Sequence, residues 1–367
     1  MSLRLEGVRR VVRGEVWIDD VTLDLEEGQL YVLLGPTLAG KTSLMRLMAG
    51  LDRPDAGRVL VDGTDVTGRS VRERSVAMVY QQFINYPTLT AYENIASPLR
   101  LKGMSRSEID RRVRETARML HIDHLLERTP GELSGGQQQR LAIARSLVKD
   151  ARLLLLDEPL VNLDYKLREE LRAELRDLFA RQRTTVVYAT TEPLEALVMG
   201  GRVIVMDEGR VRQTGPTVEV YHRPGSLRVA AVFSDPPMNM LKVSVGNGVA
   251  RSLGGLEIPL GHHLAGLPAA PYTLGIRANH LSIRRHAETD LELDATVELA
   301  EISGSETFIH VRRGDLRWVV QEEGVHEHAL GQNVRIYLDP TRLYAFGSTG
   351  ALEIAPPRAG RPGREVR

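Results

Sequence analysis

The sequence of 367 residues contains no cysteine, which excludes disulfide bonds and metal sites built on thiolates. It also lacks an excess of either charge, because Lys and Arg total 48 and so do Asp and Glu. This balance disfavours a nucleic-acid-binding protein, which usually carries a basic excess. No stretch approaches the roughly 18 apolar residues of a transmembrane helix, and the start of the chain lacks the apolar core of a secretion signal. If the protein serves a membrane, we expect it to do so from one side.

Short hydrophobic runs separated by helical patterns fill the first part of the chain. Residues 21–25 alternate between apolar and polar, which predicts antiparallel strands near the start. Buried parallel strands are predicted where apolar residues run without interruption, at 30–34, 153–156 and 185–188. Helices are predicted at 43–50, 95–130 and 137–149. This alternation predicts an α/β domain with a mostly parallel sheet over residues 1–235, including a helical insert at about 95–150.

The pattern changes after about residue 235, where two consecutive prolines interrupt the chain. Short β-like runs separated by glycine and proline follow, and they predict a small β-barrel domain over residues 236–356. The last segment, 357–367, is rich in Pro, Gly and Arg and is predicted to be disordered. The chain is therefore expected to fold as two domains with different architectures.

Residues 35–42 read Gly-Pro-Thr-Leu-Ala-Gly-Lys-Thr, which is the spacing of a phosphate-binding loop, or P-loop. In such a loop, successive backbone N–H groups surround the phosphates at the start of a helix, whose dipole also favours negative charge. Lys41 is expected to reach the β- and γ-phosphates of ATP, and the Thr42 hydroxyl is expected to bind Mg²⁺. The residues predicted to contact the nucleotide here are Gly35, Pro36, Thr37, Leu38, Ala39, Gly40, Lys41, Thr42 and Ser43.

Two acidic residues follow the apolar run at 153–156. Asp157 ends a predicted buried strand and can hold the same Mg²⁺ as Thr42. If the strands before Lys41 and Asp157 are parallel neighbours, both residues lie at one edge of the sheet, where open α/β sheets bind ligands. Glu158 is the candidate base that orients the water attacking ATP. The sequence therefore predicts a site that binds ATP with Mg²⁺ and hydrolyses ATP.

A second glycine-rich motif, Leu-Ser-Gly-Gly-Gln, ends at Gln137. Two adjacent glycines at a helix start let the backbone approach phosphate oxygens closely, so Ser134 and the N–H groups of Gly135 and Gly136 can bind a γ-phosphate. Because Lys41 already holds that side of the ATP, we expect this motif to act on ATP bound to a second subunit. Locally, Ser134 and Gln137 also predict a capping box, and this role is compatible with the first.

Together, these motifs resemble those of the ATP-binding subunits of bacterial ABC importers of the carbohydrate-uptake type, such as the maltose and glycerol-phosphate importers. The resemblance covers essentially the whole chain and implies an α/β ABC ATPase domain followed by an OB-like (TOBE-type) regulatory domain. It implies that Gln81 touches Mg²⁺ and the attacking water, and that Asp164 crosses a dimer interface. The segment 86–95 resembles the surface that faces the membrane subunits.

The resemblance also implies how the protein works and with which partners. ATP closes two ATPase subunits on each other, and this movement switches two transmembrane permease subunits, which receive the solute from a periplasmic solute-binding protein. The ATPase then lies peripherally on the cytoplasmic face of the bacterial inner membrane and has no nucleic acid partner. The sequences at 35–52 and 188–193 further resemble those of the ATPases of glycerol uptake systems, which implies glycerol or a related polyol or sugar as the solute.

Three positions depart from this family pattern. Leu38 stands where the family has glycine; because leucine adopts a positive φ only at a cost, the loop is expected to work if this position keeps a negative φ. Thr191 replaces the switch histidine; its hydroxyl can hydrogen-bond a γ-phosphate but cannot act as an imidazole acid or base. Val12 stands where an aromatic residue stacks on adenine, and Trp17 is close to it in sequence.

These departures leave two interpretations open. In one, the site is slow, and the chain is a degenerate or regulatory subunit of a heterodimer in which the partner does most of the hydrolysis. In the other, Glu158 suffices for hydrolysis, and a homodimer is also able to work. From the sequence we favour a heterodimer, because the Leu-Ser-Gly-Gly-Gln motif and Asp164 can serve the site of a different ATPase subunit.

Overall fold

The computed structural model describes every residue except 83, 162, 182–183 and 359–367. The chain divides into two compact units, Met1–Thr217 and Val218–Arg367. Most of the tail predicted to be disordered, 357–367, lies outside the described residues. Within the described part of the chain, no helix combines the length and apolarity of a membrane span.

The first unit begins with a small antiparallel sheet in the order β2-β1-β4-β5. Its strands are β1 (Leu3–Val12), β2 (Glu15–Leu25), β4 (Ala56–Val61) and β5 (Thr64–Asp65). Leu3 and Leu5 on β1 and Leu23 and Leu25 on β2 are buried, as the period of two in a strand requires. The antiparallel strands predicted near the start are therefore confirmed.

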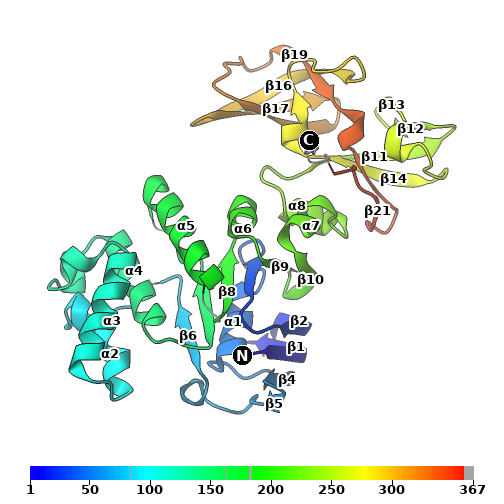
Figure 1. Ribbon diagram of the computed structural model, residues 1–367. Coiled ribbons are helices and arrows are strands. Elements are labelled where there is room, and N and C mark those ends of the chain that lie inside the picture. Colours follow the sequence, from blue (N-terminus) through cyan, green and yellow to red (C-terminus); the bar gives the residue numbers. More distant parts are fainter. Residues whose placement is uncertain (83, 162, 182–183, 359–367) are drawn as a thin grey trace, which may run out of the picture. The chain divides into compact units, whose positions relative to one another are not determined.

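A six-stranded sheet in the order β10-β9-β3-β8-β7-β6 forms the centre of this unit (Figure 1). Its strands are β3 (Leu30–Leu34), β6 (Val76–Val79), β7 (Leu153–Asp157), β8 (Thr185–Thr190), β9 (Arg202–Asp207) and β10 (Arg210–Pro216). All pairs are parallel except that of β10 with β9 at one edge. Central parallel strands are covered on both faces, which explains their uninterrupted apolar sequences. The mostly parallel sheet is confirmed.

The strand order corrects one expectation about the site. The strand β3 precedes Lys41 and β7 ends in Asp157, but β8 lies between them, so these two strands are not neighbours. The two residues still share an edge, because the carboxyl ends of parallel strands meet on one side of the sheet. Since β8 ends at Thr190, the switch position Thr191 follows the strand between the P-loop strand and the acidic pair.

Three helices directly follow site strands: α1 (Lys41–Ala49), α5 (Tyr165–Arg181) and α6 (Pro193–Met199). Helix α1 packs Leu44 and Met45 into the core cluster that the sheet also lines. It ends at Gly50, where a φ of 76° lets the backbone N–H cap the carbonyl groups of the last turn.

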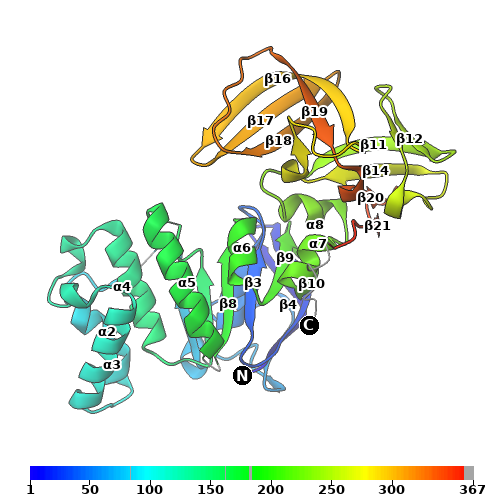
Figure 2. The ribbon, with the colours of Figure 1, turned by 45° about the horizontal axis from the view of Figure 1, so that its top comes forward.

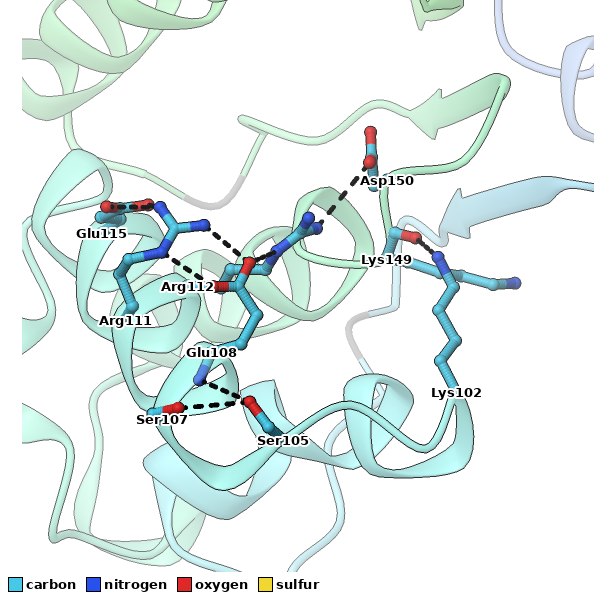
Figure 3. Close-up of polar contacts among 9 residues, drawn as sticks. All are labelled: Lys102, Ser105, Ser107, Glu108, Arg111, Arg112, Glu115, Lys149 and Asp150. Carbon is cyan, nitrogen blue, oxygen red and sulfur yellow. Dashed lines mark hydrogen bonds and ion pairs between the residues drawn. The ribbon is translucent and has the colours of Figure 1, made fainter.

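The predicted helical insert consists of α2 (Ala91–Leu101), α3 (Arg106–Met119) and α4 (Gly135–Leu147). These helices lie together beside β6 in both ribbon views (Figures 1 and 2). Short 3₁₀ turns of this unit cover Val71–Glu73, Asp123–Leu125 and Pro130–Glu132. Figure 3 shows the solvent face of α3, where Arg111 pairs with Glu108 and Glu115. Such i,i+3 and i,i+4 pairs support the helix.

The second unit contains two antiparallel sheets. The sheet β13-β12-β11-β14-β20-β21 comprises β11 (Asn239–Gly246), β12 (Val249–Ser252), β13 (Glu257–Pro259), β14 (Pro271–Ile276), β20 (Tyr344–Phe346) and β21 (Leu352–Ile354). The sheet β15-β19-β16-β17-β18 comprises β15 (Leu281–Ser282), β16 (Leu291–Ser303), β17 (Glu306–Arg313), β18 (Leu316–Glu323) and β19 (Asn333–Leu338). Leu274 of the first sheet and Trp318 of the second belong to one core cluster. This unit is the OB-like domain.

Helices α7 (Thr217–His222) and α8 (Leu227–Val232) precede these sheets. The sequence placed residues up to 235 with the ATPase domain, whereas the first unit ends at Thr217. The reason is the buried Arg277, which donates hydrogen bonds to the carbonyl oxygens of Tyr221 at 2.6 Å and Phe233 at 2.8 Å. Its guanidinium also lies 3.7 Å from the centroid of the Tyr221 ring. These contacts fix the segment to the β domain.

Candidate nucleotide site

The P-loop connects β3 to α1 at the carboxyl edge of the sheet, and two of its glycines are required by close contacts. A Cβ on Gly35 would lie 2.4 Å from the carbonyl oxygen of Met206. Gly40 has a φ of 95°, and a Cβ there would lie 2.9 Å from the carbonyl oxygen of Trp17. Only glycine fits both positions, so the spacing read from the sequence reflects a tightly packed loop.

Leu38 has a φ of 68°, so the negative φ that the sequence analysis required of this position is not found. The left-handed region costs an L-residue about 1–2 kcal/mol because Cβ approaches the following carbonyl oxygen. The side chain is 95% exposed and so recovers little burial energy. The loop thus keeps the backbone course that glycine would take, at the cost of local strain.

Replacing Leu38 by glycine is therefore expected to stabilise the first unit by about 0.5–1 kcal/mol. The relief of strain exceeds the extra entropy that glycine gains in the unfolded chain, and almost no packing is lost. Thermal unfolding would show this as a rise in Tm of roughly 1–4 °C. The variant Leu38→Ala is the matched control, since it removes the side chain but keeps the strain and should give no such gain. A lower Tm for Leu38→Gly would contradict the assignment of strain.

Lys41 is 5% exposed and lies under the P-loop. Its Nζ donates hydrogen bonds to the carbonyl oxygens of Gly35 at 2.8 Å and Pro36 at 3.1 Å. The same atom lies 3.3 Å from Oε1 of Glu158. The ammonium group of Lys41 is thus fixed by the P-loop in a position from which it can donate hydrogen bonds to phosphate oxygens.

Thr42 and Asp157 meet as the sequence predicted. The Thr42 hydroxyl donates to Oδ2 of Asp157 at 2.7 Å, and burial raises the pKa of the Asp157 carboxyl, opposed by this hydrogen bond. A hydroxyl and a carboxylate at this distance offer the oxygen ligands that Mg²⁺ prefers, so the residues present fit that ion.

Glu158 also lies within reach of Gln81. Its Oε2 accepts a hydrogen bond from Nε2 of Gln81 at 3.0 Å, and its backbone N–H donates to the carbonyl oxygen of Ala189 at 3.1 Å. Glu158 has a φ of 48°, a conformation uncommon for a residue with a side chain. Strained backbone of this kind concentrates at functional sites, where the surrounding structure determines it. The structure thus brings together Lys41, Gln81 and Glu158, three of the predicted site residues.

Thr191 lies near Glu158. Both residues line a small cavity of about 10 Å³, which is at the lower limit for holding one water molecule. Thr191 is preceded by Thr190, whose hydroxyl donates to the buried carboxyl of Glu195, and Glu195 also accepts a hydrogen bond from the Tyr188 hydroxyl at 2.6 Å. The switch position is thus anchored by a buried polar cluster that the sequence analysis did not identify.

The Leu-Ser-Gly-Gly-Gln motif starts α4, where Ser134 is the N-cap. The capping box is present: the Ser134 hydroxyl accepts from the N–H of Gln137, and the Gln137 side chain accepts from the N–H of Ser134 at 3.0 Å. Gly135 and Gly136 form the first turn of the helix, and Gly135 has open space beside it. Among the described residues, no hydrogen bond of Ser134 or Gln137 reaches the P-loop.

Asp164 lies at the start of α5, and Val12 lies at the end of β1. The Asp164 carboxylate accepts from the N–H of Leu167 at 3.0 Å and so caps α5. Val12 ends β1 and pairs with Glu15 across the hairpin turn. Trp17 is 45% exposed, and its carbonyl oxygen lies against the position where a Cβ of Gly40 would be.

Two residues near the switch position were missed by the sequence analysis. Arg168 of α5 donates to Glu192, which follows Thr191, at 2.9 Å. No motif spacing indicates this ion pair, because the partners are 24 positions apart on separate elements. The sequence of α5 mixes basic and acidic residues and so does not single out Arg168.

A P-loop between a buried strand and a helix, an acidic pair ending a parallel strand, and a glycine-rich capped helix define an ATPase of the ATP-binding cassette class. The chain belongs to the family of ATP-binding subunits of ABC importers. The ABC transporter family matches residues 18–161, and the TOBE domain family matches residues 274–346. The chain is thus an ATPase subunit that powers an importer.

Relatives of the whole chain support this assignment. The chain is 39% identical over 353 residues to the sn-glycerol-3-phosphate import ATP-binding protein UgpC of Salmonella typhimurium, covering 95% of this chain and 99% of that protein. It is 38% identical to UgpC of Escherichia coli K12 over the same length. A solved dimeric, post-hydrolysis state of the ATP-binding cassette MJ0796 bound to ADP and Pi is 30% identical, with a TM-score of 0.54, and covers 59% of this chain and 98% of that one. A second solved structure, described as a dimeric bacterial ABC transporter cassette, gives a TM-score of 0.55. The comparisons give no support to the preference for a heterodimer.

Proposed function

We propose that two copies of this chain close on ATP and that each composite site hydrolyses it. The observation that carries the proposal is the convergence of Lys41, Gln81 and Glu158 at the sheet edge, with Nζ and Nε2 both directed at the Glu158 carboxylate. In this arrangement Lys41 binds the β- and γ-phosphates. Glu158 accepts a proton from the water that attacks the γ-phosphorus, while ADP leaves.

The other site residues complete this assignment. Thr42 and Asp157 would hold Mg²⁺, which supplies charge neutralisation at the β- and γ-phosphates when bound. The Thr191 hydroxyl donates to a γ-phosphate oxygen, and Gln81 orients the attacking water. Val12 supplies apolar contact to adenine in place of an aromatic ring.

The second copy supplies the remaining contacts. Ser134, Gly135 and Gly136 of one copy bind the γ-phosphate held by the P-loop of the other, and Asp164 lies at the interface between them. Supporting this, the glycine-rich helix start is exposed, and the solved cassettes that this chain resembles are described as dimeric structures. The alternative, a degenerate subunit beside a more active partner, gains no support from the comparisons, and Glu158 keeps its place and its contacts.

The permease subunits are proposed to dock on a groove of about 330 Å³ between β6 and helices α2 and α4. Its walls include Ile84, Tyr86 and Leu101, and two cations, Arg145 and Lys149, line it as well. Burial lowers the pKa of Arg145 and of Lys149, and among the described residues neither is paired with an acid. We infer that the groove accepts an apolar helix that carries a carboxylate.

Internal contacts hold the cations of this groove in place. Lys149 donates to the carbonyl oxygen of Val76 at 2.5 Å, and its own carbonyl accepts from Lys102 (Figure 3). The guanidinium of Arg145 lies 4.2 Å from the centroid of the Tyr86 ring. Docking on permeases from this side would place the chain peripherally on the cytoplasmic face of the inner membrane, with a periplasmic binding protein delivering the solute.

The proposed solute is glycerol or its phosphate, sn-glycerol 3-phosphate. The support is the identity with the sn-glycerol-3-phosphate import proteins over almost the whole chain. Removing this chain from its host is expected to abolish uptake of at least one of these solutes in radiolabelled form, while uptake of labelled maltose stays within twofold as the control. Unchanged uptake of both glycerol and sn-glycerol 3-phosphate would overturn the assignment of solute.

A further inference from the structure

Arg168 connects two loops of the site that come from different strands. Its Nη2 lies 3.4 Å from the carbonyl oxygen of Val161 and 3.5 Å from that of Leu163, in the segment that follows Glu158. Its Nη1 donates to Oε1 of Glu192 at 2.9 Å. A single guanidinium therefore spans the loop after β7 and the loop after β8.

The geometry of Arg168 favours a fixed position over a freely moving surface pair. Its side chain is 24% exposed, and its Nε is buried without a hydrogen-bond partner among the described residues. Its planar guanidinium directs one edge to the carbonyl oxygens and the other to the carboxylate. It also lines the small cavity shared by Glu158 and Thr191.

Thr191 is held from both sides. On one side, the Thr190 hydroxyl donates to the buried Glu195 and accepts from the N–H of Glu192 at 3.0 Å. On the other side, Glu192 pairs with Arg168. Through Arg168, this second anchor reaches the carbonyl oxygens of Val161 and of Leu163, the residue before Asp164.

We propose that Arg168 and Glu192 are a positioning pair that makes the place of the Thr191 hydroxyl depend on the loop that precedes Asp164. The inference rests on the proposed function, in which Asp164 meets the second copy. Closure of the dimer then sets the positions of Val161 and Leu163, and their contacts with Arg168 set the position of Glu192. Thr191 is thereby placed for the γ-phosphate only when the second copy is present. Neither residue of the pair touches the nucleotide.

A double-mutant cycle in the full-length chain tests this proposal. Arg168→Ala and Glu192→Gln are each expected to lower kcat for ATP about 5- to 20-fold, while the Kd of a fluorescent ATP analogue stays within about twofold. The double variant is expected to lower kcat no further than either single one, because both remove the same link. Cooperativity with respect to ATP should fall with kcat, since it is the communication between the two copies that is lost.

The matched control is Arg176→Ala, on the same helix, whose arginine pairs only with the adjacent Asp177 in the described residues. It is expected to leave kcat within twofold. The charge-swapped chain, Arg168→Glu with Glu192→Arg, is expected to recover part of the lost kcat, which a simple loss of fold would not allow.

Three results would overturn the proposal: kcat within twofold for both single variants, multiplicative losses in the double variant, or a loss of ATP affinity as large as the loss of kcat. A wild-type chain without ATPase activity would overturn the proposed function itself. The two failures are therefore distinguishable.

Discussion

Replacing Glu158 by glutamine is expected to lower kcat for ATP hydrolysis by about 10²- to 10³-fold, the range of a lost general base. The amide keeps the size of the side chain and can still accept from Nε2 of Gln81, which now lies 3.0 Å from the carboxylate. It cannot take a proton from water. The Kd for ATP is expected to stay within about threefold, because Lys41 and the P-loop are intact. Steady-state hydrolysis and titration with a fluorescent ATP analogue measure the two quantities.

The same variant reports on assembly. ATP that is bound but not hydrolysed should hold two copies together, so the native mass of Glu158→Gln is expected to double on addition of ATP and Mg²⁺. Glu170→Gln, an exposed glutamate on α5, is the matched control and should hydrolyse ATP normally. A variant that binds ATP but stays monomeric would restore the heterodimer interpretation. Loss of less than tenfold in kcat would remove Glu158 from the role of base.

Replacing Lys41 by alanine is expected to raise the Kd for ATP by about 10²- to 10³-fold, which corresponds to roughly 3–4 kcal/mol. Its ammonium is almost fully buried and is fixed by the carbonyl oxygens of Gly35 and Pro36, so its positive charge is positioned before ATP arrives. Charge-assisted hydrogen bonds from such a group to phosphate are among the strongest in proteins. Without it, the triphosphate would face the Glu158 carboxylate without the compensating charge of this ammonium group.

Equilibrium titration with a fluorescent ATP analogue measures this effect. Lys166→Ala, an exposed lysine at the start of α5, is the matched control and should bind ATP normally. Alanine is a good helix former, so α1 is expected to remain intact, and circular dichroism can check this. A Kd within threefold of the wild type would show that Lys41 is not the phosphate ligand.

Much of this site could be read from spacing alone. A P-loop must bring several N–H groups to one phosphate, and this requirement fixes glycines and lysine at short, regular intervals. The acidic pair at 157–158 could also be predicted from the sequence, because a carboxylate that ends a buried apolar strand lies at the edge of a parallel sheet. Local geometry imposes these patterns, so a single sequence is enough to recognise them.

Contacts between segments that are distant in the chain could not be predicted from the sequence. The strand order β3-β8-β7 sets Thr191 between the P-loop strand and the acidic pair, and nothing in the sequence gives the order of parallel strands. The positive φ of Leu38 was also missed, because the conformation is imposed by the surrounding loop and is not one that leucine itself favours. The pair of Arg168 with Glu192 likewise depends on the packing of α5 beside α6.

By itself, then, the sequence determined that the protein is an ATP-binding cassette with a following β domain, and it identified the groups that carry the phosphate chemistry. These properties follow from short-range requirements: which backbone can bend, which side chain carries charge, and which run can be buried. Only the tertiary structure decided which groups face Glu158, at which residue the β domain begins, and which contacts hold the switch position Thr191. Those outcomes depend on long-range packing, because they are set by contacts between residues that are far apart in the chain.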